Sequence, residues 1–232
     1  MAKHNVWMSV SDLMTGLMVI FLFVAIAYMS KVRKNQSVLT DYVETKDSLH
    51  SKLVKEFAGD TLQWKMSIGT DLTMKFKNPT VLFAQGSWQL TPEFCEILDD
   101  FLPRYFNILL NDSLKTKIEE IRIEGHTDNV PMPQLDPDPY IANVILSQYR
   151  ALSVLRYFRS MKAFEKFSDE DKRLMEFWLT SNGLSYGKAL DRNGQYTIVS
   201  GKDIDKQLSR RVEFRIVTNG DVILENFVKK NK

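Results

Sequence analysis

Residues 9–29, SVSDLMTGLMVIFLFVAIAYM, divide the chain into a membrane segment and the domain that follows it. No charged residue occurs between positions 13 and 30, and most side chains there are large and apolar. A helix rises 1.5 Å per residue, so about 20 such residues cross the roughly 30 Å hydrocarbon core of a bilayer. Trp7 and Tyr28 flank the run where interfacial aromatic side chains commonly lie. We therefore expect one transmembrane helix over residues 9–30, after a short head of residues 1–8.

One acidic residue, Asp12, lies at the start of this apolar run. A charged aspartate near the membrane centre costs about 2.5–3.5 kcal/mol. Such a group is tolerated when it is neutral, when it faces a protein partner, or when it serves an ion path. The pattern alone leaves two interpretations open: Asp12 caps the helix at the water interface, or it carries a proton inside a membrane complex.

The spacing of Asp12, Met14, Thr15 and Met18 resembles the D-[FL]-M-T-x-[ML]-M segment of MotB-type stator subunits. This resemblance implies that Asp12 carries the transported ion, with Thr15 beside it. The ion is expected to be H⁺ or Na⁺, with the proton favoured, and no cofactor is expected. Flagellar members usually have a longer basic head, so the chain looks closer to the ZorB stator subunits of Zorya anti-phage defence systems.

The sequence gives contradictory signals for the orientation of the anchor. Three basic residues follow the helix within positions 31–34 and only Lys3 precedes it, so the positive-inside rule places the C-terminal side in the cytoplasm. We expect the opposite, a cytoplasmic N-terminus and a periplasmic domain at the inner membrane, because the downstream domain resembles a cell-wall binder. Residues 25–27 also resemble a signal-peptide cleavage site, but the weak basic head, the long apolar run and Asp12 favour an uncleaved anchor.

Beyond the anchor, the pattern predicts an α+β chain: a helical linker over residues 31–60, a domain over residues 61–222, and a polar tail over residues 223–232. The domain is expected to be an α/β sandwich, with one mixed sheet and helices on one face. The predicted elements are a hairpin over 62–76, a short strand over 81–84, a helix from Thr91 and Pro92 towards residue 110, a strand over 118–124, a helix from 141, a helix over 168–177 and a strand over 208–217.

Four blocks in this domain resemble the OmpA-like peptidoglycan-binding domain. They are VLFxxGSxxLTP at 81–92, IRIEGHTD at 121–128, NxxLSxxRA at 143–151 and LSRRVEF at 208–214. The chain departs from the family pattern at Ser209, where Asn is usual, and in a longer, proline-rich loop after Asp128. The resemblance covers roughly residues 72–217 and implies binding to peptidoglycan.

An acid at a strand end and an arginine at a helix start can clamp a zwitterionic ligand. Asp128 would take an ammonium group, and Arg150 would bind a carboxylate through two parallel hydrogen bonds. The diaminopimelate side chain of a cell-wall stem peptide offers both charges. His126 is expected to be structural. The family pattern adds the following residues to the predicted pocket: Thr127, Asn143, Leu146, Ser147 and Arg211.

Composition excludes several function classes. The net charge of +2 provides no basic field for nucleic acid. The single Cys95 is expected in the core, the histidines are scattered without metal-ligand spacing, and no catalytic constellation is present, so we predict neither a metal site nor an enzyme.

One helix is too little to line a channel. We therefore expect a MotA/ZorA-like multi-spanning partner, five copies for two of this chain, with this chain as a dimer. The alternatives are a flagellar MotB-type subunit and a non-conducting OmpA-like tether between membrane and wall.

Overall fold

The structure is a computed structural model that describes residues 3–84 and 86–230. Contacts divide the chain into two compact units, Met1–Glu44 and Thr45–Lys232. The helix α1 (Lys3–Phe57) contributes to both. Within the described residues, one helix contains a segment long and apolar enough to cross a membrane, and it lies in Val10–Phe57. The large apolar side chains of that segment are exposed on the helix surface.

The second unit is built around one five-stranded mixed sheet. Its strand order is β1-β2-β5-β3-β4, and every pair is antiparallel except β3 with β4. The strands are β1 (Met66–Ile68), β2 (Thr73–Phe76), β3 (Ile118–His126), β4 (Leu179–Gly183) and β5 (Arg211–Thr218). A parallel pair needs a long crossover connection, and the helices between β3 and β4 provide it.

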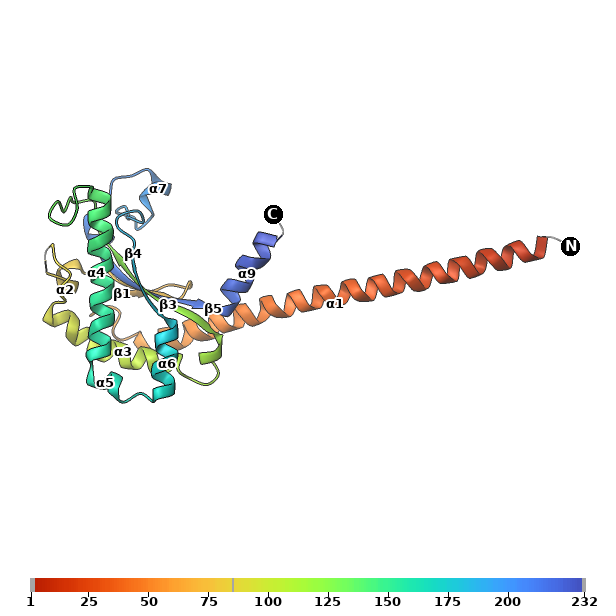
Figure 1. Ribbon diagram of the computed structural model, residues 1–232, viewed down its shortest axis with the longest axis horizontal. Coiled ribbons are helices and arrows are strands. Elements are labelled where there is room, and N and C mark those ends of the chain that lie inside the picture. Colours follow the sequence, from red (N-terminus) through yellow and green to blue (C-terminus); the bar gives the residue numbers. More distant parts are fainter. Residues whose placement is uncertain (1–2, 85, 231–232) are drawn as a thin grey trace. The chain divides into compact units, whose positions relative to one another are not determined.

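Two long helices accompany this sheet. Figure 1 shows α4 (Pro139–Ser160) lying along the sheet, with α3 (Pro92–Leu109) nearby. The remaining helices are α2 (Pro79–Leu82), the 3₁₀ helix η1 (Lys115–Lys117), α5 (Lys162–Glu165), α6 (Asp169–Trp178), α7 (Thr197–Ser200), α8 (Lys206–Ser209) and α9 (Asn219–Lys230). The predicted fold class is therefore confirmed: a long apolar N-terminal helix, a helical region, and a mixed α/β domain.

The core lies between the helices and one face of the sheet. Phe101 of α3 is at its centre, with its ring centroid 5.1 Å from those of Phe76 on β2 and Phe214 on β5. These aromatic pairs are tilted or edge-to-face, the arrangement that the ring quadrupole favours. Val212, Phe214 and Ile216 alternate along β5 towards this core, because successive side chains of a strand point to opposite faces.

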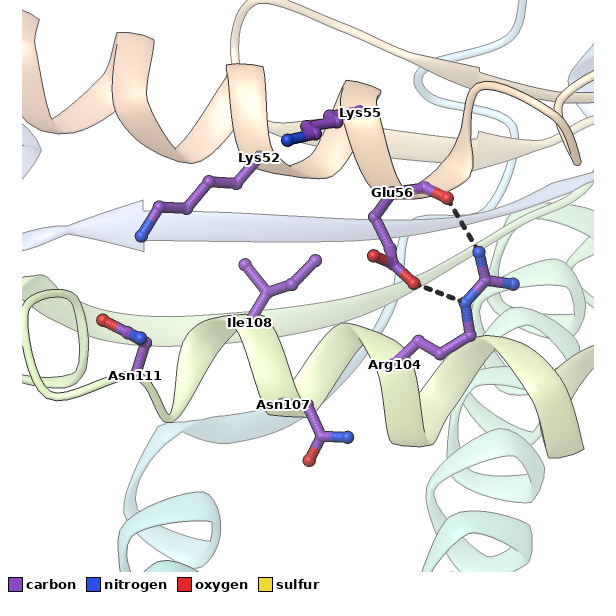
Figure 2. Close-up of a pocket in the computed structure, with 7 residues that line it drawn as sticks. All are labelled: Lys52, Lys55, Glu56, Arg104, Asn107, Ile108 and Asn111. Atoms are coloured by element: carbon purple, nitrogen blue, oxygen red, sulfur yellow. Dashed lines mark hydrogen bonds and ion pairs between the residues drawn. The ribbon is translucent and has the colours of Figure 1, made fainter.

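The last turns of α1 belong to this core. Leu49, Leu53 and Phe57 recur every four residues and are fully buried, and the Phe57 ring is 5.2 Å from Phe101. Arg104 of α3 reaches back to this segment: its Nε donates to the Glu56 carboxylate and one terminal nitrogen to the Glu56 carbonyl, both at 2.7 Å (Figure 2). The compact unit thus begins at Thr45, inside the segment predicted as linker, rather than at residue 61.

Several predicted elements differ from the structure. The strand predicted over residues 81–84 is wrong, because residues 79–82 form the short helix α2 and only Phe83 pairs with Leu90 in an isolated bridge. Most of the predicted polar tail is the helix α9, and residues 231–232 lie outside the described part of the chain. The strand β4, LTSNG, has no alternating pattern and was not predicted.

Candidate functional site

The predicted acid of the pocket follows the end of β3, and the predicted base lies in the middle of α4. Asp128 follows β3 by two residues and is 5% exposed; its Oδ1 accepts a hydrogen bond from the Val130 backbone at 3.1 Å. Arg150 lies on α4 and is 7% exposed. Burial lowers the pKa of Arg150 to about 10, while the Asp128 carboxylate opposes this shift. The two predicted principal residues therefore interact electrostatically in the structure.

Arg150 is held in a fixed orientation. Its Nε donates to the Ser87 carbonyl at 3.0 Å, and its guanidinium carbon lies 5.1 Å from the centre of the Phe83 ring. Since a guanidinium is planar, a hydrogen bond at Nε also fixes the direction of its terminal nitrogens.

A second arginine, Arg210, faces the same carboxylate. Its Nη1 is 3.6 Å from Asp128 Oδ2, and its side chain is about one third exposed. Burial and the positive charge of Arg210 both lower the pKa of Arg150. The Asp128 carboxylate raises it and so offsets the repulsion between the two guanidinium groups. Arg210 was not among the predicted site residues.

The pocket contains buried polar atoms that lack a hydrogen-bond partner within the described residues. They are Thr127 Oγ1, Asp128 Oδ2 and Arg210 Nε. A buried donor or acceptor left unpaired costs about 1–3 kcal/mol. A ligand that brings both donors and acceptors would therefore be stabilised at this point of the fold.

Other predicted pocket residues support the loop and the helix. Asn143 Nδ2 donates to the carbonyls of Val130 and Pro139, both at 2.9 Å, which ties the proline-rich loop to the first turns of α4. Ser147 Oγ accepts from the Ser185 backbone at 3.0 Å, and the Ser185 carbonyl accepts from the Thr127 backbone at 3.1 Å. Leu146 is also buried. These residues thus support the pocket by holding the loop after Asp128 against α4.

A glycine sets the distance between β3 and α4. A Cβ added at Gly125 would lie 2.1 Å from the Ser147 carbonyl oxygen, a backbone atom of α4. The absence of a side chain therefore permits a close approach of helix to strand. This approach holds the helix that carries Arg150 beside the strand that leads to Asp128.

Arg211 does not join the pocket as predicted. Its Nε donates to Glu213 Oε1 at 2.6 Å, and its terminal nitrogens donate to the carbonyls of Ser209 and Lys188. Arg210 precedes β5 and faces Asp128, whereas Arg211 begins the strand and pairs with Glu213, so the two adjacent arginines have different partners. The alternation of apolar residues along β5 was the signal that could have placed Arg211 on the face away from the core.

That second face carries a buried polar cluster formed by Glu124, His126 and Glu213, whose ligand-type atoms lie within 4.8 Å of one another. Such a set can hold a metal ion, but Arg211 and Lys75, at 2.6 and 3.7 Å from Glu213, already supply positive charge. Burial alone raises the pKa of Glu213, and the Arg211 guanidinium holds it below its ordinary value. Burial lowers the pKa of His126, and the carboxylates oppose this. The cluster is thus balanced in charge without an ion.

The predicted ion-carrying residues lie in the first unit. Asp12 and Thr15 are three residues apart on α1, so they share one face of the helix, and both are exposed on it. The Thr15 hydroxyl donates to the Ser11 carbonyl at 2.8 Å, one turn earlier.

Two comparisons with known proteins concern the sequence. Residues 82–182 match the OmpA family. The chain is 36% identical over 235 residues to the Zorya protein ZorB of Escherichia coli (strain ATCC 8739), and the alignment covers 97% of this chain and 92% of that protein.

Solved structures that resemble this fold share little sequence with it. One is the periplasmic domain of Helicobacter pylori MotB, with 16% identity, a TM-score of 0.37, and coverage of 68% of this chain and 88% of that chain. Another is the OmpA-like domain of FopA1 from Francisella tularensis, with 18% identity, a TM-score of 0.36, and coverage of 66% and 80%. The sequence alignment, which extends over nearly the whole of both proteins, confirms the predicted resemblance: the chain belongs to the ZorB family and carries an OmpA-family domain.

Proposed function

We propose that this chain is a stator-type subunit that anchors a multi-spanning, MotA/ZorA-like membrane partner to peptidoglycan and carries the transported ion on Asp12. The observation that carries the wall-binding part is the pocket at Asp128, where one buried carboxylate faces Arg150 and Arg210 and polar atoms lack partners. The name of the Zorya relative supports a role in anti-phage defence over one in the flagellar motor.

The pocket suits a ligand with separated charges of both signs. An ammonium group of a wall stem peptide would pair with Asp128, and a carboxylate would be shared by the two arginines through charge-assisted hydrogen bonds. The ligand would take over part of the Arg210–Asp128 ion pair, which is longer, at 3.6 Å, than a charge-assisted hydrogen bond. A diaminopimelate residue carries the required groups on one side chain.

Cosedimentation of the purified full-length chain with peptidoglycan tests this part. Asp128→Ala and Arg150→Ala should each weaken the apparent affinity for peptidoglycan at least tenfold, which is the loss expected for one charge-assisted contact. Asp169→Ala removes an exposed aspartate of α6 and serves as the matched control. Binding that survives both pocket substitutions would refute the wall-binding assignment.

The ion-carrying part rests on an acid within an apolar helix. Moving one charge through a potential of 100 mV releases about 2.3 kcal/mol, so a protonation cycle at Asp12 can drive rearrangement of a partner. One helix cannot enclose an ion path, so we propose a complex of two copies of this chain with five partner subunits. Copurification with the partner, followed by counting the subunits, tests this stoichiometry.

Asp12→Asn should abolish phage protection and ion flux in cells that also express the partner, because the amide cannot exchange a proton. The variant should still reach the membrane and cosediment with peptidoglycan, since its wall-binding pocket is untouched. Undiminished protection would instead favour a passive tether between membrane and wall.

We place the N-terminus in the cytoplasm, the helix in the inner membrane and the OmpA-family domain in the periplasm, where peptidoglycan is located. This orientation opposes the charge bias around the helix. A C-terminal alkaline phosphatase fusion, which is active only outside the cytoplasm, should be active; an inactive fusion at normal expression would contradict the proposed topology.

A further inference from the structure

Two exposed aromatic side chains form a pair beside the arginine of the pocket. Trp88 and Tyr149 are 39% and 41% exposed, and their ring centroids lie 5.0 Å apart with the planes tilted by 52°. Trp88 belongs to the segment between Phe83 and Leu90, and Tyr149 belongs to α4. The pair therefore joins two segments that are far apart in the sequence.

The hydrogen bond that orients Arg150 joins the same two segments. Arg150 Nε donates to the Ser87 carbonyl at 3.0 Å, and each aromatic residue is the chain neighbour of one partner in that bond. Neighbouring Cα atoms are 3.8 Å apart, so the two aromatic residues begin next to the two residues that this hydrogen bond joins.

The segment that carries Trp88 is internally bonded. The Ala84 backbone donates to the Gln89 carbonyl at 3.2 Å, the Ser87 backbone donates to the Ala84 carbonyl at 3.0 Å, and Ser87 Oγ accepts from the Gln89 backbone. Ordering of this kind lowers the entropic cost of binding, because the aromatic surface is arranged before a ligand arrives.

We propose that Trp88 and Tyr149 form a saccharide-binding platform for the glycan strand to which the stem peptide is attached. This inference rests on the wall binding proposed for Asp128 and Arg150. A pyranose ring has one face of C–H bonds that lies flat on the electron-rich face of an aromatic ring. The indole N–H can donate to a sugar hydroxyl, and the phenol can donate or accept. Peptide and sugar would thus occupy adjoining parts of one site.

The chemistry of the exposed surface favours a sugar over a purely apolar partner. Both side chains combine an aromatic face with a polar edge, and the pocket beside them is lined by charged groups. A sugar ring is amphipathic in the same way. Its covalent link to the stem peptide also keeps it close once the peptide is bound, as in any two-part ligand.

Isothermal titration of the full-length chain in detergent tests this proposal. The two ligands are a soluble diaminopimelate-containing stem peptide and the same peptide attached to the N-acetylglucosamine–N-acetylmuramic acid disaccharide. The wild-type chain should bind the disaccharide-bearing ligand about tenfold more tightly than the free peptide. Trp88→Ala and Tyr149→Ala should each reduce this preference to about twofold or less.

Two controls separate the platform from the pocket and from exposed aromatics in general. Phe177→Ala removes another exposed aromatic, on α6, and should keep the wild-type preference. Asp128→Ala should weaken both ligands together.

If Trp88→Ala and Tyr149→Ala both kept the wild-type preference for the disaccharide-bearing ligand, the platform would be overturned. An equal loss of affinity for both ligands would also overturn it, because the pair would then only support Arg150. Equal wild-type affinity for the two ligands would overturn the platform while leaving the pocket intact. Failure of the wild-type chain to bind either ligand would instead overturn the wall-binding function itself.

Discussion

Substitution of Gly125 by alanine should separate α4 from β3 and damage both stability and ligand binding. The added Cβ would lie 2.1 Å from the oxygen, 3.0 Å from the carbon and 3.3 Å from the Cα of Ser147. All three are backbone atoms of a helix, so no side-chain rotation relieves the overlap. The helix must move by roughly 1 Å, or the strand must bend, in an interior that is packed as densely as a crystal.

The size of the effect follows from this geometry. Overpacking a core typically costs about 1–3 kcal/mol, and an overlap with backbone belongs at the upper end because the only response is movement of a whole element. We therefore expect a loss of about 3 kcal/mol in the free energy of unfolding. The same movement shifts Arg150, which lies on α4, away from Asp128, so peptidoglycan binding should fall together with stability.

Denaturant unfolding of the full-length chain in detergent, read by tryptophan fluorescence, measures the loss, and cosedimentation with peptidoglycan measures the binding. Gly59→Ala is the matched control, because a Cβ at that position meets nothing within 4 Å. The control should change the free energy of unfolding by less than about 1 kcal/mol. If Gly125→Ala proved as stable as Gly59→Ala, the inferred close contact between helix and strand would be wrong.

Two further predictions concern stability. Burial keeps the pKa of His126 in the folded state below its ordinary value of 6.5, so the unfolded chain binds a proton at this histidine first as the pH falls. Stability is therefore lost below about pH 6.5, at up to about 1.4 kcal/mol per pH unit. In His126→Gln, the stability measured by thermal denaturation should begin to decline only near pH 4.5. There Glu213, whose pKa is lowered from 4.5, starts to lose its contribution to stability. If the variant lost as much stability as the wild type between pH 6.5 and 5, His126 would be excluded as the source of that loss. Arg104→Met removes bonds to Glu56, Asp60 and Asp100 and should cost about 1–2 kcal/mol in urea unfolding. Arg159→Met breaks an exposed pair with Glu176 and the contact of the guanidinium with the Phe164 ring, and should cost less than about 1 kcal/mol. Equal losses in these two arginine variants would contradict the structural role given to Arg104.

Elements with strong local signals could be predicted from the sequence. Thr91 accepts from the Phe94 backbone as the N-cap of α3, and Pro92 occupies the first turn, where its missing N–H is not needed. Ser168 caps α6 in the same way. These signals lie within a few residues of the helix start and do not depend on distant contacts.

Elements decided by tertiary contacts could not be predicted in this way. The apolar run at 81–84 reads equally well as a strand or a buried turn, and packing against α3 decides for the short helix α2. The sequence pattern also did not reveal where the domain begins. Leu49, Leu53 and Phe57 have the spacing of any amphipathic linker, and only their burial against α3 shows that they belong to the core.

The pocket illustrates both outcomes at the level of side chains. Asp128 and Arg150 were predicted by resemblance, and the structure places them together. Arg211 was assigned to the pocket by resemblance to the family pattern, whereas in the structure it pairs with Glu213 and Arg210 lies near Asp128.

The different side chains on the two faces of β5 have a consequence for the fidelity of folding. If β5 slipped by one position against its neighbours, every side chain would change face. The charged pair of Arg211 and Glu213 would turn to the apolar side, and the aromatic ring of Phe214 would turn to the polar side. An error of register would therefore cost free energy on both faces of the sheet, so the alternation of apolar and charged side chains along β5 fixes its alignment.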